Sequence, residues 1–160
     1  MKSLAELIPD KITTRIISEQ DGQDLIICID DKPVYFIEVK SKWLESTPIR
    51  ISRNQTIRAF EEKNRYALCS IDMTKYKGQD REEVQSIDVI KEFMYFNTDI
   101  GERVEHLISI YQETNQPDKF RLDGDYRTHI PLKYIEKGSG LEDFENLLVE
   151  YLKKEHSKKS

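Results

Sequence analysis

The stretch "PVYFIEVKSKW" (residues 33–43) is rich in β-branched and aromatic residues, so it predicts a β-strand over residues 34–42. Near its end, this apolar strand carries two opposite charges, Glu38 and Lys40. Because successive side chains of a strand point to opposite faces, Glu38 and Lys40 share one face. Either the two charges neutralise each other, or they belong to a site that contains further polar groups.

Apolar runs of strand length flank this stretch on both sides. They predict strands over residues 11–20, 24–30, 34–42, 48–52 and 66–73. Residues 53–67 have apolar positions near helical spacing, and Ser52 or Asn54 can cap the start of that helix. Four strands, a helix and a further strand are typical of an α/β (α+β) fold, in which helices flank a mixed central sheet.

The second half of the chain predicts elements that are added to this sheet. We expect helices over residues 81–96, 100–114 and 140–154, the last beginning near Ser139, and one or two strands over 120–135. The whole chain is then a single domain over residues 1–160, with a core at 11–76, an extension at 77–154 and a frayed tail at 155–160.

Length and composition describe a globular protein: 160 residues suffice for one domain with a core, and 34 % of them are charged. A net charge of −5 argues against general coating of nucleic acid but allows a local basic site. No apolar segment reaches the length of a membrane span or of a signal peptide, and Cys28 and Cys69 predict buried free thiols. We therefore expect a cytoplasmic protein.

A second carboxylate is predicted to lie beside Glu38. A hairpin turn centred on Asp31 would place Asp24 directly opposite Glu38, whereas a slip of one residue would turn Asp24 to the other face. Two carboxylates that converge at strand ends form a hard-oxygen site for Mg²⁺ or Mn²⁺. A neighbouring lysine such as Lys40 can stabilise charge that develops on a phosphate, or orient a water molecule.

The spacing of Glu38 and Lys40 has a simpler interpretation. A glutamate and a lysine near a strand end often form only an ion pair. The same spacing recurs at Glu61 and Lys63, on the predicted helix, where no site is expected.

The residues around Glu38 resemble a known superfamily. Asp24, followed on the next strand by Glu38-Val39-Lys40, resembles the PD-(D/E)xK superfamily of metal-dependent nucleases, which have a restriction-endonuclease-like core. The longer text "YFIEVKSKW…IRISRNQTIRAF…YALCSID" is similar to the NO VEIN C-terminal domain family. Such domains often end large bacterial proteins, several of them implicated in phage defence.

The resemblance implies roles for particular residues. Asp24 and Glu38 would bind metal together with the Val39 carbonyl, Lys40 would be the catalytic lysine, and Gln55 would support the site from the following helix. Gln55 can equally be a simple helix-start residue. Some branches have Gln-x-x-x-Tyr here, whereas this chain has Ala59 at the last place.

The superfamily usually begins with a helix that carries an acidic residue. Only "MKSLAELI" precedes the first predicted strand, and Glu6 is its sole acidic residue. We therefore expect the chain to be a piece of a longer parent protein.

Basic residues concentrate next to the candidate site. Residues 40–65 hold seven basic and three acidic residues, a net charge of +4 that leaves −9 for the rest. Such clustering is what phosphate binding requires, although it also fits a solvated face. Trp43 could stack on a base or cap the core edge. The residues predicted to bind DNA are Lys42, Trp43, Arg50, Arg53 and Arg58.

Two functions from different classes remain open. The first is a Mg²⁺- or Mn²⁺-dependent nuclease that hydrolyses DNA phosphodiester bonds. The second is a nuclease-like fold that has lost catalysis and binds nucleic acid, or docks to the rest of a larger protein or complex. The intact Asp24, Glu38 and Lys40 favour the first, and the missing acidic helix favours the second.

Overall fold

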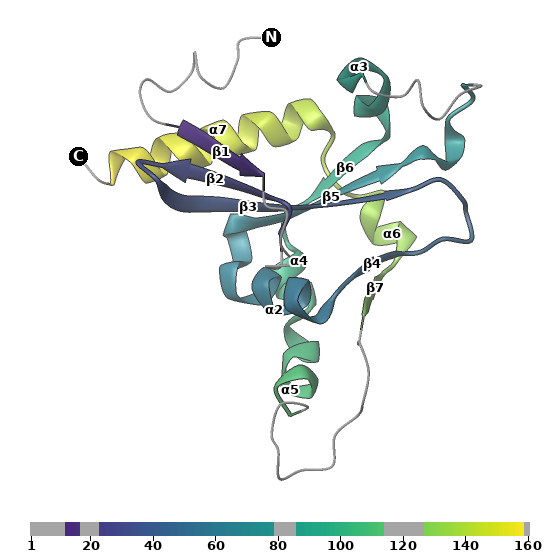
Figure 1. Cartoon of the computed structure of the whole chain (residues 1–160), viewed down its shortest axis with the longest axis horizontal. Coiled ribbons are helices and arrows are strands. Elements are labelled where there is room, and N and C mark those ends of the chain that lie inside the picture. Colours follow the sequence, from purple (N-terminus) through teal and green to yellow (C-terminus); the bar gives the residue numbers. More distant parts are fainter. Residues whose placement is uncertain (1–11, 17–22, 79–85, 114–126, 159–160) are drawn as a thin grey trace.

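A mixed β-sheet with helices on both faces forms the centre of the protein (Figure 1). The computed structural model describes residues 12–16, 23–78, 86–113 and 127–158. In these residues, the sheet has five strands in the order β1-β2-β3-β5-β6, and β4 and β7 form a separate two-stranded ribbon. The strands are β1 (Ile12–Ile16), β2 (Leu25–Ile29), β3 (Lys32–Lys42), β4 (Ile49–Ile51), β5 (Tyr66–Asp72), β6 (Met94–Asn97) and β7 (Thr128–Ile130). The predicted mixed α/β class is confirmed.

The β2–β3 hairpin sets the register of the candidate site. Asp30 and Asp31 both have positive φ, 51° and 61°, which a two-residue turn of this kind requires. The turn is therefore centred between these two residues and not on Asp31. A bulge between Ile27 and Cys28 then shifts the pairing by one residue, so that Leu25 faces Ile37. Beyond the bulge, the register is the one that the sequence predicted.

Helix α2 (Arg53–Glu62) connects the first strands to β5, which lies parallel to β3. Its N-cap is Ser52, one of the two predicted caps, whose side chain accepts a hydrogen bond from the Gln55 backbone N–H. The helix ends at Glu62 and a 3₁₀ turn follows, so the predicted helix over 53–67 is too long. Tyr66 already begins β5.

Helix α7 (Leu141–Ser157) covers one face of the sheet, where its apolar side chains pack against β2, β3, β5 and β6 (Figure 1). The Phe144 ring stacks on Phe96 of β6 with centroids 4.0 Å apart, and Tyr35 of β3 packs against the same helix. Residues 155–157 belong to this helix, so the prediction of a frayed tail from residue 155 was wrong. The helix begins after Gly140, without a side-chain cap from Ser139.

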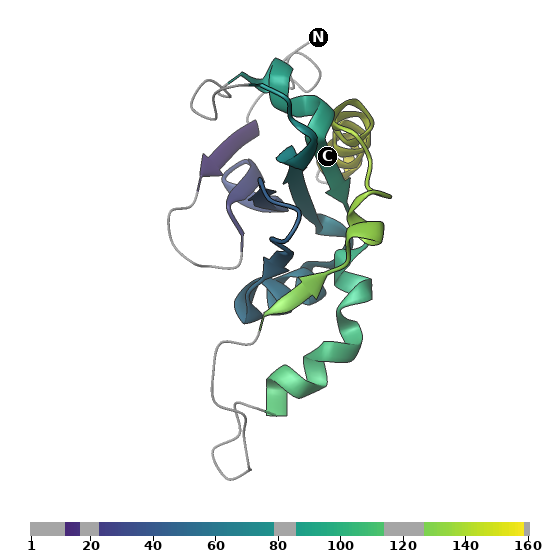
Figure 2. The same ribbon diagram turned by 90° about the vertical axis from the view of Figure 1, so that its right-hand side faces the viewer.

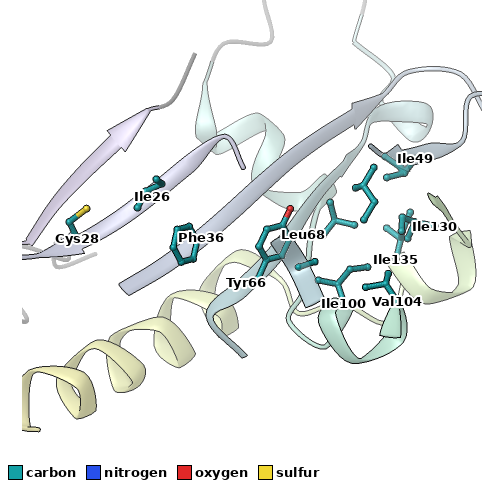
Figure 3. Close-up of a cluster of buried hydrophobic side chains, with 12 residues drawn as sticks. Ile26, Cys28, Phe36, Ile49, Tyr66, Leu68, Ile100, Val104, Ile130 and Ile135 are labelled. Atoms are coloured by element: carbon teal, nitrogen blue, oxygen red, sulfur yellow. The ribbon is translucent and has the colours of Figure 1, made fainter. Parts of the chain in front are cut away.

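The opposite face of the sheet carries the second core cluster (Figure 3). Tyr66 and Leu68 of β5 face Ile100 of α4 (Ile100–Arg103), while Ile49 and Ile130 come from the β4–β7 ribbon. Helices α4 and α5 (Glu105–Glu113) divide the predicted helix over 100–114 at Val104. Figure 2 shows α5 and the ribbon together at one end of the molecule, away from α7.

Two predictions in the second half need correction. In the described part of the predicted helix over 81–96, only Ile87–Ile90 (α3) and a 3₁₀ turn are helical, because Met94–Asn97 is strand β6, paired with β5. The strand region predicted over 120–135 contains β7, but Pro131 is followed by the helical turn α6 (Leu132–Ile135). Outside the described residues lie parts of the predicted elements, at 11, 17–20, 81–85, 114 and 120–126, and the segment "MKSLAELI".

Candidate functional site

Asp24 is held where β2 begins, beside the second half of β3. Its backbone N–H donates to the Ile37 carbonyl at 3.0 Å, and its Oδ2 accepts a hydrogen bond from the Val39 backbone N–H at 2.8 Å. Ile26 of β2 pairs with Phe36 of β3, so the side chain two residues before Ile26 lies on the same face as the one two residues after Phe36. Asp24 and Glu38 therefore share a face, as the sequence predicted.

The Glu38 side chain is buried, with a relative exposure of 0 %. Its Oε1 accepts hydrogen bonds from the Lys40 ammonium and from the Gln55 side-chain amide. Its Oε2 is buried and has no hydrogen-bond partner among the described residues. A buried carboxylate oxygen without a partner is energetically costly, so this oxygen is suited to an additional ligand.

Burial raises the pKa of Glu38 from 4.5 to about 7. The hydrogen bond and the positive charge of Lys40 oppose this rise, whereas the negative charge of Asp24 adds to it. Burial is therefore the main cause of the raised pKa of Glu38, and the charge of Asp24 makes a smaller contribution.

Gln55 belongs to the helix start and to the site at the same time. Its backbone N–H donates to the Ser52 hydroxyl, and its side-chain oxygen accepts from the Ser52 backbone N–H at 2.7 Å, which completes a capping box. The amide nitrogen is then directed at Glu38 Oε1. Gln55 is therefore a helix-start residue that also contacts Glu38, and its supporting role in a site stays a prediction.

The donors near Glu38 suit a small hard cation. Within the described residues, no three His, Cys, Asp or Glu side chains form a metal-binding group, so the protein side chains would supply two carboxylates. In an antiparallel pair, the N–H and C=O of one residue point to the same neighbour, so we expect the Val39 carbonyl to point toward Asp24. Mg²⁺ is commonly held by one or two carboxylates plus phosphate and water, and the partnerless Glu38 oxygen fits this donor set.

Tyr66 is a neighbour of the site that the sequence analysis missed. Burial raises the pKa of its hydroxyl, and the negative charges of Glu38 and Asp24 raise it further. Tyr66 pairs with Phe36 in the parallel β3–β5 register. That register is set by the crossover through α2, and no local pattern in the sequence reports it.

The predicted DNA-binding residues do not form one exposed face. Lys42 is 7 % exposed, and its ammonium pairs with Asp72 at 3.2 Å, so the structure does not present it to a ligand as the sequence analysis expected. The half-buried Trp43 ring stands edge-on to Tyr76, with centroids 6.2 Å apart. This placement agrees with a cap on the core edge.

The three arginines predicted to bind DNA differ in their surroundings. Arg53 donates to the Tyr111 carbonyl at 3.3 Å. Arg58 pairs with Glu62 at 3.3 Å and lies over the Phe36 ring. Arg50 is exposed on β4.

Both cysteines are buried free thiols, as predicted.

Comparison with known proteins identifies the family of the chain. None of the helices described is long and apolar enough to cross a bilayer. Neither a curated protein nor a solved structure matches the chain. The family described as "Protein NO VEIN, C-terminal" matches residues 5–86, just over half of the chain, a range that includes Asp24, Glu38, Lys40 and Gln55. The chain therefore belongs to the NO VEIN C-terminal family.

Proposed function

We propose that this domain is a metal-dependent nuclease of the PD-(D/E)xK superfamily, which hydrolyses phosphodiester bonds of DNA. One observation carries the proposal: the carboxyl groups of Asp24 and Glu38 meet on one face of the sheet, with the Lys40 ammonium bound to Glu38. The ordinary ion pair between Glu38 and Lys40 does not account for this arrangement, because it leaves a second, buried Glu38 oxygen without a partner.

In this proposal, metal binding and charge stabilisation belong to different residues. Asp24, Glu38 and the Val39 carbonyl would hold the cation. Bound Mg²⁺ or Mn²⁺ would supply a Lewis acid for the phosphate and lower the pKa of a coordinated water. The Lys40 side chain is 28 % exposed, so its ammonium can reach a substrate phosphate while it remains beside Glu38. There it stabilises the negative charge that develops on the phosphate oxygens.

Gln55 acts in this proposal as a positioning residue. It fixes one oxygen of Glu38 by a hydrogen bond, and the capping box fixes Gln55 itself at the start of α2. The other Glu38 oxygen, which has no hydrogen-bond partner among the described residues, then remains available to a cation. Such supporting contacts commonly contribute about 10–100-fold to metal affinity or activity.

The test combines metal binding with plasmid nicking. Mn²⁺ is titrated calorimetrically into the wild type, Glu38→Gln and Lys40→Ala, and each protein is then incubated with supercoiled plasmid and Mg²⁺ or Mn²⁺. Two controls are matched to the chain: Glu61→Gln removes an exposed carboxylate from the same Glu-x-Lys spacing, and Lys32→Ala removes an exposed lysine from the other end of β3.

We expect Glu38→Gln to lose both Mn²⁺ binding and nicking. Lys40→Ala should keep Mn²⁺ binding but lose nicking, and both controls should behave like the wild type. If Lys40→Ala nicks plasmid as fast as the wild type, or if Glu38→Gln binds Mn²⁺ with unchanged affinity, the nuclease proposal is wrong. A nucleic-acid or protein docking module would then replace it.

A further inference from the structure

A polar hollow of about 370 Å³ begins beside Lys40. Its volume falls at the lower end of the range of ligand pockets, roughly 300–1,000 Å³. The residues that line it are Lys40, Ser41, Ser46, Thr47, Pro48, Ile49, Arg50 and Arg127. Three of them are cationic and three carry a hydroxyl, whereas none is acidic, although the chain has more acidic than basic residues. This lining suits an anion.

The ribbon of β4 and β7 brings the two arginines together. Arg50 pairs with His129 across the ribbon. The neighbours of Arg50 along β4 are buried, and so are the neighbours of His129 along β7, which leaves Arg50 and His129 on the outer face. Arg127 precedes His129 by two residues, so it is expected on the same outer face, diagonal to Arg50.

The hollow adjoins the candidate active site and shares one residue with it. Lys40 lines the hollow and pairs with Glu38, so one side chain belongs to both. Among the described residues, the Arg50 guanidinium forms no ion pair, and it is exposed. An arginine guanidinium binds phosphate through two parallel N–H donors, and serine and threonine hydroxyls add further donors.

We infer that this hollow binds a backbone phosphate of the nucleic acid, one that flanks the phosphodiester group at Glu38 and Lys40. The inference rests on the proposed function for the identity of the ligand. Arg50 and Arg127 bind this flanking phosphate, and Ser46 and Thr47 line the pocket in which it lies. By holding the strand on one side, the hollow sets which phosphodiester group reaches Lys40.

The experiment measures DNA binding without divalent metal, so it does not depend on cleavage. The affinity of a short fluorescent DNA duplex is measured by anisotropy over a series of salt concentrations. The proteins are the wild type, Arg50→Ala, Arg127→Ala and the double variant. Lys153→Ala serves as the control that is matched in charge to each single variant, because it removes one exposed positive charge from α7, on the other face of the sheet.

We expect the double variant to bind more weakly and to show a salt dependence that is shallower by about one unit in log–log slope, as the loss of one phosphate contact predicts. Lys153→Ala should leave the slope unchanged. Because Arg50 and Arg127 are exposed, the urea midpoints should not change. A salt slope of the double variant equal to that of Lys153→Ala overturns the inference, and so does the absence of duplex binding by the wild type.

A methylphosphonate scan tests the position of the phosphate. Each phosphate of the duplex is replaced in turn by a neutral methylphosphonate. At one position the replacement should weaken wild-type binding but leave binding of the double variant unchanged. If no position behaves in this way, the inference fails. Plasmid nicking that is intact in the double variant, with an unaltered salt slope, would reject the hollow and keep the nuclease. A positive scan without nicking would keep the hollow and reject the nuclease.

Discussion

Replacing Glu38 by glutamine removes a buried carboxylate, and its effect on stability should depend on pH. In the metal-free protein, the pKa of Glu38 is raised from 4.5 to about 7, chiefly by burial. Between these pH values the folded protein keeps a proton that the unfolded chain has already released. The contribution of Glu38 to stability is therefore most favourable below about pH 4.5, and it is lost as the pH rises toward 7.

The size of the effect follows from the shift. At about 1.36 kcal/mol for each pKa unit, the full change is roughly 3 kcal/mol. Between about pH 5 and about pH 8, the linkage relation gives roughly 2.5 kcal/mol. Glutamine has no proton to lose in this range. Relative to the wild type, Glu38→Gln should therefore be more stable at about pH 8 than at about pH 5, by roughly 2.5 kcal/mol in the free energy of unfolding.

Urea unfolding, followed by the fluorescence of the single tryptophan Trp43, measures this difference. Wild type and Glu38→Gln are compared at both pH values in the presence of a chelator. Steric effects of the amide are the same at both pH values, so they cancel in the comparison. Glu61→Gln, which changes an exposed carboxylate on α2, should show little change between the two.

The reasoning is refuted if the stability difference between wild type and Glu38→Gln is the same at both pH values. Glu38 would then not titrate in this window. Its burial beneath α2 would not have the electrostatic consequence that the structure implies.

Three further substitutions test other parts of the structure. Gln55→Ala removes the capping box and the hydrogen bond to Glu38, so the free energy of unfolding should fall by about 1–2 kcal/mol and Mn²⁺ should bind about 10–100-fold more weakly. An unchanged Mn²⁺ affinity by calorimetry would contradict the positioning role of Gln55. Lys42→Met removes the ammonium that pairs with Asp72 and leaves this carboxylate only its hydrogen bonds from Thr74. Stability to urea at neutral pH should fall by about 3 kcal/mol, whereas an unchanged midpoint would show that the ion pair does not stabilise the fold. Phe144→Ala removes the ring stacked on β6 and should cost about 3–5 kcal/mol in thermal unfolding; a loss below about 1 kcal/mol would mean that α7 does not cover the sheet as described.

The sequence by itself determined the strand that carries the candidate site and the face on which the charges lie. Apolar and β-branched residues in β3 favour a strand, and its period of two places Glu38 and Lys40 together. Ser52 marked the start of α2 because a side-chain cap is a local interaction. The position of Asp24 was correct for an incomplete reason, because the expected turn was displaced and the bulge compensated for it.

Only the tertiary structure decided features that depend on distant partners. Met94–Asn97 is a strand because β5 offers its backbone hydrogen bonds and the core buries Phe96, neither of which the local pattern reports. The pairing of Lys42 with Asp72 follows from the parallel register after a helical crossover.

The same holds for the two features on which the proposals depend. Arg127 reaches Arg50 and Lys40 only because β7 pairs with β4, far away in the sequence. The raised pKa of Glu38 arises because packing removes its carboxylate from water. Local patterns determine which residues share a strand face, whereas burial and long-range pairing depend on how the whole chain packs.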